Sequence, residues 1–277
     1  MEIKCIALDL DCTTLNAEGA LSEGNRKALE YAISKGIHII IASGRPFCAL
    51  PEDVMAVPGI EYAITSNGAA VYHVPTGKRL HGFTMDPESV REILRLTKDE
   101  PVIYETFLEG VAYMDAALMR DPAAYGFGDP RSIRYLESTR TPMENIHAFI
   151  EEHIHELDSF DLIFWDKAVS KRVGAMLQER VPNIYSTSTI WPLLELSHKD
   201  AGKHSGVRFV TELLGLSPAQ TAAFGDGDND LEMLQYVGCG VAMANACPAC
   251  LAVADRITGH HNEDGLAQGI YQLLENN

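Results

Sequence analysis

Asp9 and Asp11 stand two positions apart at the end of an apolar segment, in the sequence CIALDLDCTTL of residues 5–15. In a β-strand, residues i and i+2 point to the same side of the sheet. Two carboxylates placed in this way repel each other unless a cation lies between them or one of them holds a proton. The segment alone is equally compatible with two solvated turn residues. The pair therefore indicates a chemical site only in combination with other residues.

Three further polar motifs each directly follow a predicted strand or open a predicted helix. They are Ser43-Gly44-Arg45, Lys203, and Asp226 with Asn229 and Asp230. If the strands are parallel, their carboxyl ends meet at one edge of the sheet, and a lysine at a nearby helix start reaches the same point. Several carboxylates with few basic neighbours offer a set of oxygen ligands. Such a set suits Mg²⁺ better than zinc. The Ser43 hydroxyl, the Gly44 backbone N–H and Lys203 supply donors for a phosphoryl group.

Strand and helix patterns alternate at both ends of the chain, in residues 1–82 and 200–277. The predicted strands are residues 3–8, 37–42, 61–65 and 220–224, with a hairpin closed at residues 75–77. The predicted helices begin after Ser22, at about Lys203, after Asn245 and at about Asp264. This alternation predicts an α/β fold with a doubly wound, mostly parallel, Rossmann-like sheet that has helices on both faces. Ligands bind at the carboxyl ends of the strands in such sheets.

Residues 83–199 differ in character from the segments on either side. They combine longer strand-like stretches such as PVIYETFLEGVAYM with helical patterns such as PESVREILRLT. This mixture predicts an α+β insert between the two halves of the sheet. Tyr104, Glu105, Tyr113 and Trp165 are candidates for a substrate-facing surface of the insert. Aromatic residues on strands are more often packed inside, so both interpretations stay open.

The composition restricts the class of protein. With 277 residues, of which 46% are hydrophobic, the chain can form one or two domains with sizeable cores. No signal-peptide pattern is present, and no stretch approaches the roughly 18 apolar residues of a membrane span, so we expect a cytoplasmic protein that binds no membrane. The net charge of −17 and the lack of a Lys/Arg cluster argue against nucleic acid as a partner. We expect a monomer or a homodimer.

Six cysteines are scattered through the sequence, mostly among apolar residues, which is typical of reduced and buried thiols. Cys247 and Cys250, in ACPAC, have the spacing of half of a redox or zinc site. No second half-site accompanies them, and Pro248 suits the first turn of a helix. We therefore interpret the pair as helical residues, and a redox role for this pair or for Cys12 stays open.

The motifs together resemble those of a known family. In chain order they are DLDCTTL, IIIASGRP, Lys203 at a helix start and FGDGDNDLEML, accompanied by TSNGA, GVAMANA and NEDGLAQGI. The chain thereby resembles the haloacid dehalogenase superfamily, and within it the Cof-like phosphatases that carry a large α+β cap. The resemblance implies a core formed by residues 1–82 and 200–277, with residues 83–199 as the cap. Cys12 stands where the family usually has glycine, and Thr14 where it usually has an apolar residue.

The resemblance also implies a role for each motif residue. Asp9 would attack phosphorus and form an aspartyl-phosphate, and Asp11 would protonate the leaving alkoxide and later deprotonate the attacking water. Mg²⁺ would be held by the carboxylates of Asp9 and Asp226 and by the backbone carbonyl of Asp11, with Asp230 supporting the site from outside the ligand set. The residues implied to contact the phosphate or substrate are Ser43, Gly44, Arg45, Lys203 and Asn229. The implied substrate is a small phosphorylated metabolite such as a sugar phosphate.

Two other functions use similar residues. A phosphomutase forms the same aspartyl-phosphate but returns the phosphoryl group to a sugar. A phosphoacceptor module of the receiver type also gathers aspartates around Mg²⁺, but such modules are about half this length, lack a cap and lack a second aspartate two residues after the nucleophile. The sequence therefore favours a Mg²⁺-dependent phosphatase.

Overall fold

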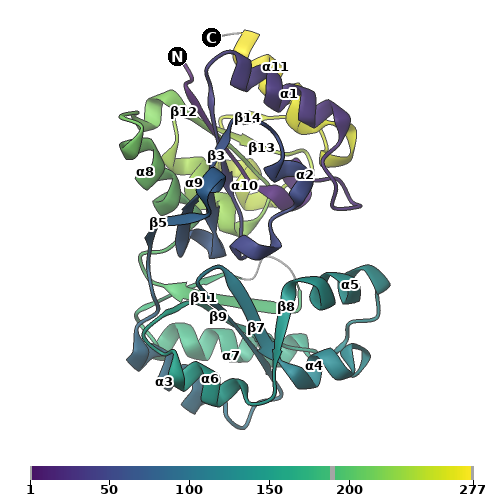
Figure 1. Cartoon of the computed structure of the whole chain (residues 1–277), viewed down its shortest axis with the longest axis vertical. Helices are drawn as coiled ribbons and strands as arrows, with labels where there is room; N and C mark the ends of the chain where they lie inside the picture. The colour runs from purple at the N-terminus through teal and green to yellow at the C-terminus, as the bar shows by residue number, and fades with distance from the viewer. Residues whose placement is uncertain (1, 188–190, 276–277) are drawn as a thin grey trace. The chain divides into compact units, whose positions relative to one another are not determined.

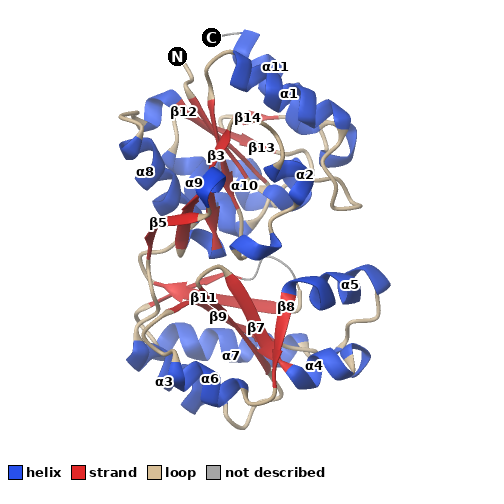
Figure 2. Cartoon of the chain, viewed as in Figure 1, coloured by secondary structure: helices blue, strands red, loops and turns tan. Residues whose placement is uncertain are grey.

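The chain forms two compact units in a computed structural model that describes residues 2–187 and 191–275 (Figure 1; Figure 2). The first unit comprises Met1–Arg45, Leu50–Gly82 and Gly202–Asn277. The second comprises Pro46–Ala49 and Phe83–Ala201. The short segment Pro46–Ala49 groups with the second unit although it lies within the first half of the α/β pattern. Each unit has its own sheet and its own core.

The first unit is built on a sheet with the strand order β14-β13-β12-β1-β2-β3-β4-β5. Its strands are β1 (Cys5–Leu8), β2 (His38–Ala42), β3 (Ile60–Thr65), β4 (Ala70–His73), β5 (Lys78–Gly82), β12 (Thr221–Gly225), β13 (Cys239–Ala242) and β14 (Arg256–Ile257). Neighbouring strands are parallel from β14 to β3, and the hairpin of β4 and β5 continues the sheet antiparallel. The doubly wound, mostly parallel sheet predicted from the sequence is confirmed.

Helices cover both faces of this sheet. Helices α8 (Lys203–Leu213), α9 (Leu231–Tyr236) and α10 (Pro248–Val253) pack on one face, where Ala7 and Ile40 belong to the buried core. Helices α1 (Glu23–Ser34) and α11 (Gly265–Glu275) lie side by side on the other face, where Gly269 approaches the ring of Phe224 (Figure 1). Strands covered on both faces need apolar residues at every position, which explains the unbroken apolar runs in the sequence.

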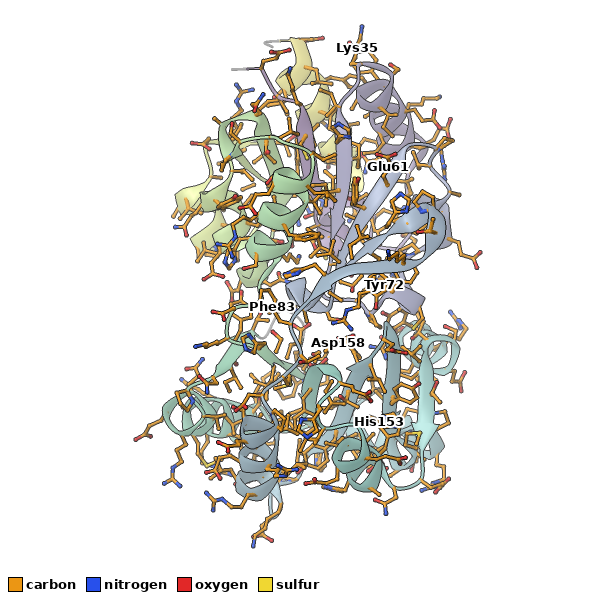
Figure 3. The ribbon with its side chains drawn as sticks, turned by 60° about the vertical axis from the view of Figure 1, so that its left-hand side comes forward. Lys35, Glu61, Tyr72, Phe83, His153 and Asp158 are labelled. Carbon is orange, nitrogen blue, oxygen red and sulfur yellow. The ribbon has the colours of Figure 1, made fainter. Side chains whose placement is uncertain are left out.

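The local signals in the sequence act as predicted at several element ends. Ser22 caps α1, because its hydroxyl accepts a hydrogen bond from the Asn25 backbone N–H. The hairpin of β4 and β5 closes around Gly77, which has a positive φ. The side chain of Tyr72 on β4, labelled in Figure 3, is buried. The Ser22 cap and the Gly77 turn are the short-range signals here. They fix where α1 begins and where the chain turns between β4 and β5.

The second unit is an α+β structure with the strand order β10-β11-β9-β6-β7-β8. Its strands are β6 (Ile103–Leu108), β7 (Val111–Asp115), β8 (Arg140–Met143), β9 (Leu157–Ile163), β10 (Ile184–Thr187) and β11 (Leu193–His198). Its helices are α3 (Pro87–Thr97), α4 (Ala116–Arg120), α5 (Pro130–Thr139), α6 (Ile146–Glu152) and α7 (Lys167–Arg180). The short helix α2 (Glu52–Met55) belongs to the first unit. Neighbouring strands are antiparallel except β7 and β8.

One face of this second sheet forms a core with α3, α6 and α7. Tyr104 faces these helices and stacks on Phe160, so it is a packing residue. Its neighbour Glu105 points to the opposite face, as strand alternation requires, and forms a buried ion pair with Arg140 at 2.6 Å. The Phe83 ring, labelled in Figure 3, stacks on His198.

The other two candidates of the insert also differ from each other. Tyr113 packs against Phe149 of α6. Trp165, just after β9, is 40% exposed and meets Tyr125 edge-on. Of the four residues considered from the sequence, Tyr104 and Tyr113 are therefore packing residues, and Trp165 has an accessible ring. Across the described ranges 2–187 and 191–275, no helix combines the length and the apolar character needed to cross a membrane.

We expect Gly68→Ala to destabilise the protein more than Gly77→Ala. Both glycines have a positive φ, so alanine strains the backbone at either position. At Gly68 the added Cβ would also lie 2.0 Å from the carbonyl oxygen of Gly202, whereas at Gly77 it would meet open space. The additional loss in free energy of unfolding at Gly68 should be about 1–3 kcal/mol. Urea unfolding measures both variants, and an equal loss would contradict the close approach.

Candidate active site

The register of the first sheet brings three chain segments to one level. Leu8 at the end of β1 pairs with Phe224 of β12 on one side and with Ile41 of β2 on the other. The next residues of all three strands therefore emerge together at the carboxyl edge. Asp9 continues β1 in an extended conformation, and its N–H donates to the Phe224 carbonyl at 3.0 Å. The predicted convergence of the strand ends follows directly from this register.

Lys203 opens α8, and its side chain is fully buried. Its ammonium group donates to Asp9 Oδ1 at 2.5 Å and to Asp230 Oδ1 at 2.7 Å. Burial acts to lower the pKa of Lys203, but the charges of Asp230 and Asp9 outweigh it and raise the pKa above its usual value. Lys203 is therefore a permanently charged group between two carboxylates.

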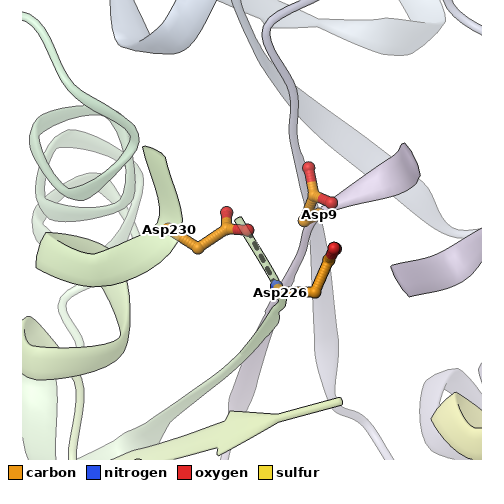
Figure 4. Close-up of side chains that lie close together, drawn as sticks. All are labelled: Asp9, Asp226 and Asp230. Carbon is orange, nitrogen blue, oxygen red and sulfur yellow. Dashed lines mark hydrogen bonds between the residues drawn. The ribbon is translucent and has the colours of Figure 1, made fainter. Parts of the chain in front are cut away.

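The loop after β12 is held together by Asp230. Its Oδ2 accepts hydrogen bonds from the backbone N–H groups of Asp226 and Gly227, each at 3.0 Å, as Figure 4 shows for Asp226. The carboxylate of Asp226 accepts from the Thr13 hydroxyl at 2.7 Å. Asp230 thus has both oxygens engaged by the protein itself, and Asp226 has one engaged.

Asp9, Asp226 and Asp230 form a cluster in which one oxygen of each lies within 4.8 Å of the others (Figure 4). When all three carboxylates are ionised, the single ammonium of Lys203 leaves two negative charges uncompensated. Burial and the charge of Asp230 raise the pKa of Asp9, and burial raises the pKa of Asp226 to about 6. A divalent cation would balance this charge, and an all-oxygen donor set suits a hard cation. The cluster can therefore hold one metal ion.

Asp11 lies outside this cluster. Its two carboxylate oxygens accept hydrogen bonds from Arg45, at 2.9 Å from Nε and 2.6 Å from Nη2. The backbone N–H of Arg45 in turn donates to the Ser43 hydroxyl oxygen at 3.1 Å. A planar guanidinium that binds both oxygens fixes the orientation of a carboxylate. Arg45 therefore links Asp11 to the segment that follows β2.

Ser43, Gly44 and Asn229 occupy the remaining positions at this edge. Ser43 directly follows β2 and is buried, and Gly44 is half-buried. Asn229 is also buried, and its side-chain Nδ2 donates to Asn67 Oδ1 at 2.9 Å. Within the described part of the chain, the side-chain oxygen of Asn229 has no hydrogen-bond partner. A buried acceptor of this kind needs a donor, which a water molecule or a hydroxyl group of a ligand can supply.

Two residues with central contacts were not singled out from the sequence. Asn67, in TSNGA, has a φ of 50°, and its backbone binds Ser43 O at 3.1 Å and Gly202 N at 2.8 Å. Together with its bond to Asn229, these contacts join three segments of the site. The Asn-Gly turn was the available signal, because asparagine and glycine tolerate positive φ. Thr13, which binds Asp226, lies within the DLDCTTL motif, and that motif was its available signal.

Comparisons with known proteins agree with this geometry. Residues 6–270 match the family described as haloacid dehalogenase-like hydrolase. YxeH of Bacillus subtilis is 30% identical over 98% of this chain and 98% of its own, and the phosphatase YwpJ of the same organism is 29% identical over 98% and 100%. A haloacid dehalogenase-like hydrolase from B. subtilis superposes with a TM-score of 0.83 at 26% identity, covering 98% of this chain and all of that one.

The matched region includes every segment that contributes to the aspartate cluster, from Asp9 to Asp230. The likeness also extends over nearly the whole of each chain, so the second unit is included. The chain therefore belongs to the haloacid dehalogenase superfamily, where it is a Cof-like hydrolase of phosphoric monoesters.

Proposed function

We propose that the protein is a Mg²⁺-dependent phosphatase that hydrolyses small phosphorylated metabolites through an aspartyl-phosphate on Asp9. The observation that carries the proposal is the buried Asp9 carboxylate, bound by Lys203 and adjacent to Asp226 and Asp230. Asp9, Asp226 and the backbone carbonyl of Asp11 would hold Mg²⁺, with Asp230 fixing the loop. When bound, the ion supplies positive charge that offsets the charge of the phosphoryl oxygens.

Asp9 is suited to attack because Lys203 binds only one of its oxygens. In the first step, an Asp9 oxygen bonds to phosphorus while the bond from phosphorus to the leaving alkoxide breaks, and Asp11 gives its proton to the alkoxide. In the second step, Asp11 takes a proton from water, the water oxygen bonds to phosphorus, and the bond to Asp9 breaks. Lys203, the Ser43 hydroxyl and the Gly44 N–H hold the phosphoryl oxygens in place through both steps. The second N–H of Asn229 Nδ2, the one not donated to Asn67, joins them.

Arg45 acts on Asp11 in this scheme. Both Asp11 oxygens accept from Arg45, so Asp11 must loosen part of this contact to reach a leaving group. Asp11 must hold a proton in the first step and lack it in the second. A carboxyl group that can move away from Arg45 and return to it can serve both steps. Arg45 is then a positioning residue for Asp11.

We also propose that residues 83–199 set the selectivity among substrates. Every residue of the phosphoryl-transfer scheme belongs to the first unit, which offers contacts to the phosphate that all phosphomonoesters share. Recognition of the rest of the substrate therefore requires other side chains. Trp165 is a candidate, because its exposed ring offers a surface for apolar or ring contacts.

We expect activity to require Mg²⁺ and to depend on Asp226. Removal of divalent cations with a chelator should lower kcat for a generic aryl phosphate by a factor of about 100 or more, since the ion supplies several kcal/mol of charge stabilisation. Asp226→Asn should raise the Mg²⁺ concentration needed for half-maximal rate. Asp99→Asn is the matched control, because Asp99 is exposed and outside the aspartate cluster. Full-rate hydrolysis by metal-free protein would refute the proposal.

We expect Asp9→Asn and Asp11→Asn to fail at different steps. Asp9→Asn should abolish turnover and leave no phosphorylated protein after an acid quench. Asp11→Asn should lower turnover by about 10²–10⁴-fold, yet a substrate with a good leaving group should still phosphorylate Asp9. Mass spectrometry of quenched protein measures the intermediate, and release of inorganic phosphate excludes a mutase. Phosphate found on Ser or Thr would show that the nucleophile is misassigned.

We expect Trp165→Ala to change selectivity rather than chemistry. The ratio of kcat/KM between two phosphorylated metabolites should shift several-fold, while hydrolysis of a minimal aryl phosphate stays nearly constant. Tyr31→Ala is a matched control, since Tyr31 is an aromatic residue of the first unit with 37% exposure. If the control shifted the ratio as much as Trp165→Ala, the assignment of selectivity to the second unit would be wrong.

A further inference from the structure

Cys247 and Cys250, in ACPAC, contact the loop that carries Asp226. Cys247 is the residue before α10 and has an extended backbone, with φ −62° and ψ 154°, and Cys250 lies in the first turn of the helix. Cys250 is buried and Cys247 is partly exposed. Their sulfur atoms bind oxygens of two adjacent residues, Asp228 and Gly227, and burial raises the pKa of the Cys250 thiol. The pair thus has one accessible and one buried thiol that reach neighbouring points of the same loop.

Both thiols also bind the Asp226–Asp230 loop. Cys250 Sγ donates to the Gly227 carbonyl oxygen at 3.0 Å, and Cys247 Sγ donates to Asp228 Oδ1 at 3.3 Å. The backbone N–H of Cys247 donates to the Asp226 carbonyl oxygen at 2.8 Å. The conformation of three consecutive loop residues therefore depends on contacts with the cysteine pair.

We propose that Cys247 and Cys250 form a reversible disulfide with low-molecular-weight disulfides, and that this bond lowers activity by displacing the loop that carries Asp226. The second part rests on the proposed function, and the first part does not. Two cysteines separated by two residues at the start of a helix have a spacing that closes a disulfide without long-range movement of the chain.

The exchange proceeds in two balanced steps. The Cys247 thiolate attacks one sulfur of the small disulfide, which forms a mixed disulfide and releases one small thiolate that takes up a proton. Cys250 then loses its proton to solvent and attacks Cys247 Sγ, which forms the internal bond and releases the second small thiolate. Two electrons and two protons pass from the protein to the small disulfide. Cys247 acts first because it is partly exposed, whereas Cys250 is buried.

Oxidation changes the contacts of the loop from attractive to repulsive. Each S–H group now donates to an oxygen, but a disulfide sulfur has no proton to donate. The sulfur lone pairs would then face the Gly227 carbonyl and the Asp228 carboxylate. The loop loses two donated hydrogen bonds, and we expect it to shift, with Asp226 and Asn229 shifting with it. Loss of such supporting contacts around a metal site lowers affinity or activity by about 10–100-fold.

Metal binding by the cysteine pair is less well supported than disulfide formation. A zinc site needs four ligands, and among residues 2–187 and 191–275 the one group of three or more close His, Cys, Asp or Glu ligands is Asp9, Asp226 and Asp230. Asp228 contacts Cys247 but does not complete such a group with Cys250. The experiment below distinguishes the two cases. A disulfide blocks alkylation of both cysteines and makes the peptide two hydrogens lighter. Bound zinc would block alkylation without this loss of hydrogen.

The test equilibrates the full chain in mixtures of reduced and oxidised glutathione, alkylates the remaining thiols and maps them by peptide mass spectrometry. We expect a Cys247–Cys250 disulfide that dithiothreitol reverses. The oxidised form should show kcat/KM about tenfold lower for an aryl phosphate, and calorimetry should show Mg²⁺ affinity about tenfold lower. Cys247→Ser and Cys250→Ser should each abolish both effects, and serine at position 250 retains a donor for the Gly227 carbonyl.

Two other exposed cysteines provide controls. Cys48→Ser and Cys12→Ser should leave the sensitivity to oxidised glutathione unchanged. Absence of the mapped disulfide, loss of sensitivity in Cys12→Ser, or an oxidised form with unchanged kcat/KM and Mg²⁺ affinity would each overturn the proposal. If the reduced protein hydrolysed no phosphomonoester, the proposed function would fail, while the disulfide and the Mg²⁺ affinity would still decide this inference.

Discussion

The contact of the Lys203 ammonium with Asp9 and Asp230 is the interaction on which the architecture of the site depends. A buried charge is tolerated only when it is paired and hydrogen-bonded. Lys203 binds one carboxylate at the end of β1 and one of the β12 loop, so it joins segments that are far apart in the sequence. One ammonium cannot balance three ionised carboxylates, and this excess of negative charge is why the cluster could hold a cation.

Much of this site was predictable because it depends on strand ends. Asp9, Ser43 and Asp226 each follow a buried strand, and a parallel register with β1 at the centre brings them to one edge. The apolar runs, the Ser22 cap and the Asn245–Pro248 helix start were local signals, and the structure has the corresponding elements. Local chemistry and parallel topology therefore sufficed for the core of the fold.

The remaining contacts were not predictable because they depend on side-chain direction. The pairing of Asp11 with Arg45, and of Thr13 with Asp226, results from how the turn after β1 is bent. In that turn Asp11 is extended and Cys12 has a φ of 58°. A strand pattern predicts that Asp9 and Asp11 share one side, whereas this turn directs Asp11 away from the cluster. The Asn-Gly turn signals the backbone conformation of Asn67, but its three partners are distant in sequence and could not be predicted from it.

The backbone of Cys12 is left-handed, and its contacts link the turn after β1 to the segment that carries Cys247 and Cys250. A left-handed backbone is unfavourable for any residue with a Cβ and persists only where surrounding contacts fix it. Here the Cys12 carbonyl accepts from the Asn245 side chain, and the same side chain accepts from the His261 N–H. Two residues later, the backbone of Cys247 binds Asp226. The segment after β13 thus supports both the turn after β1 and the loop of Asp226, so a change within this segment affects both.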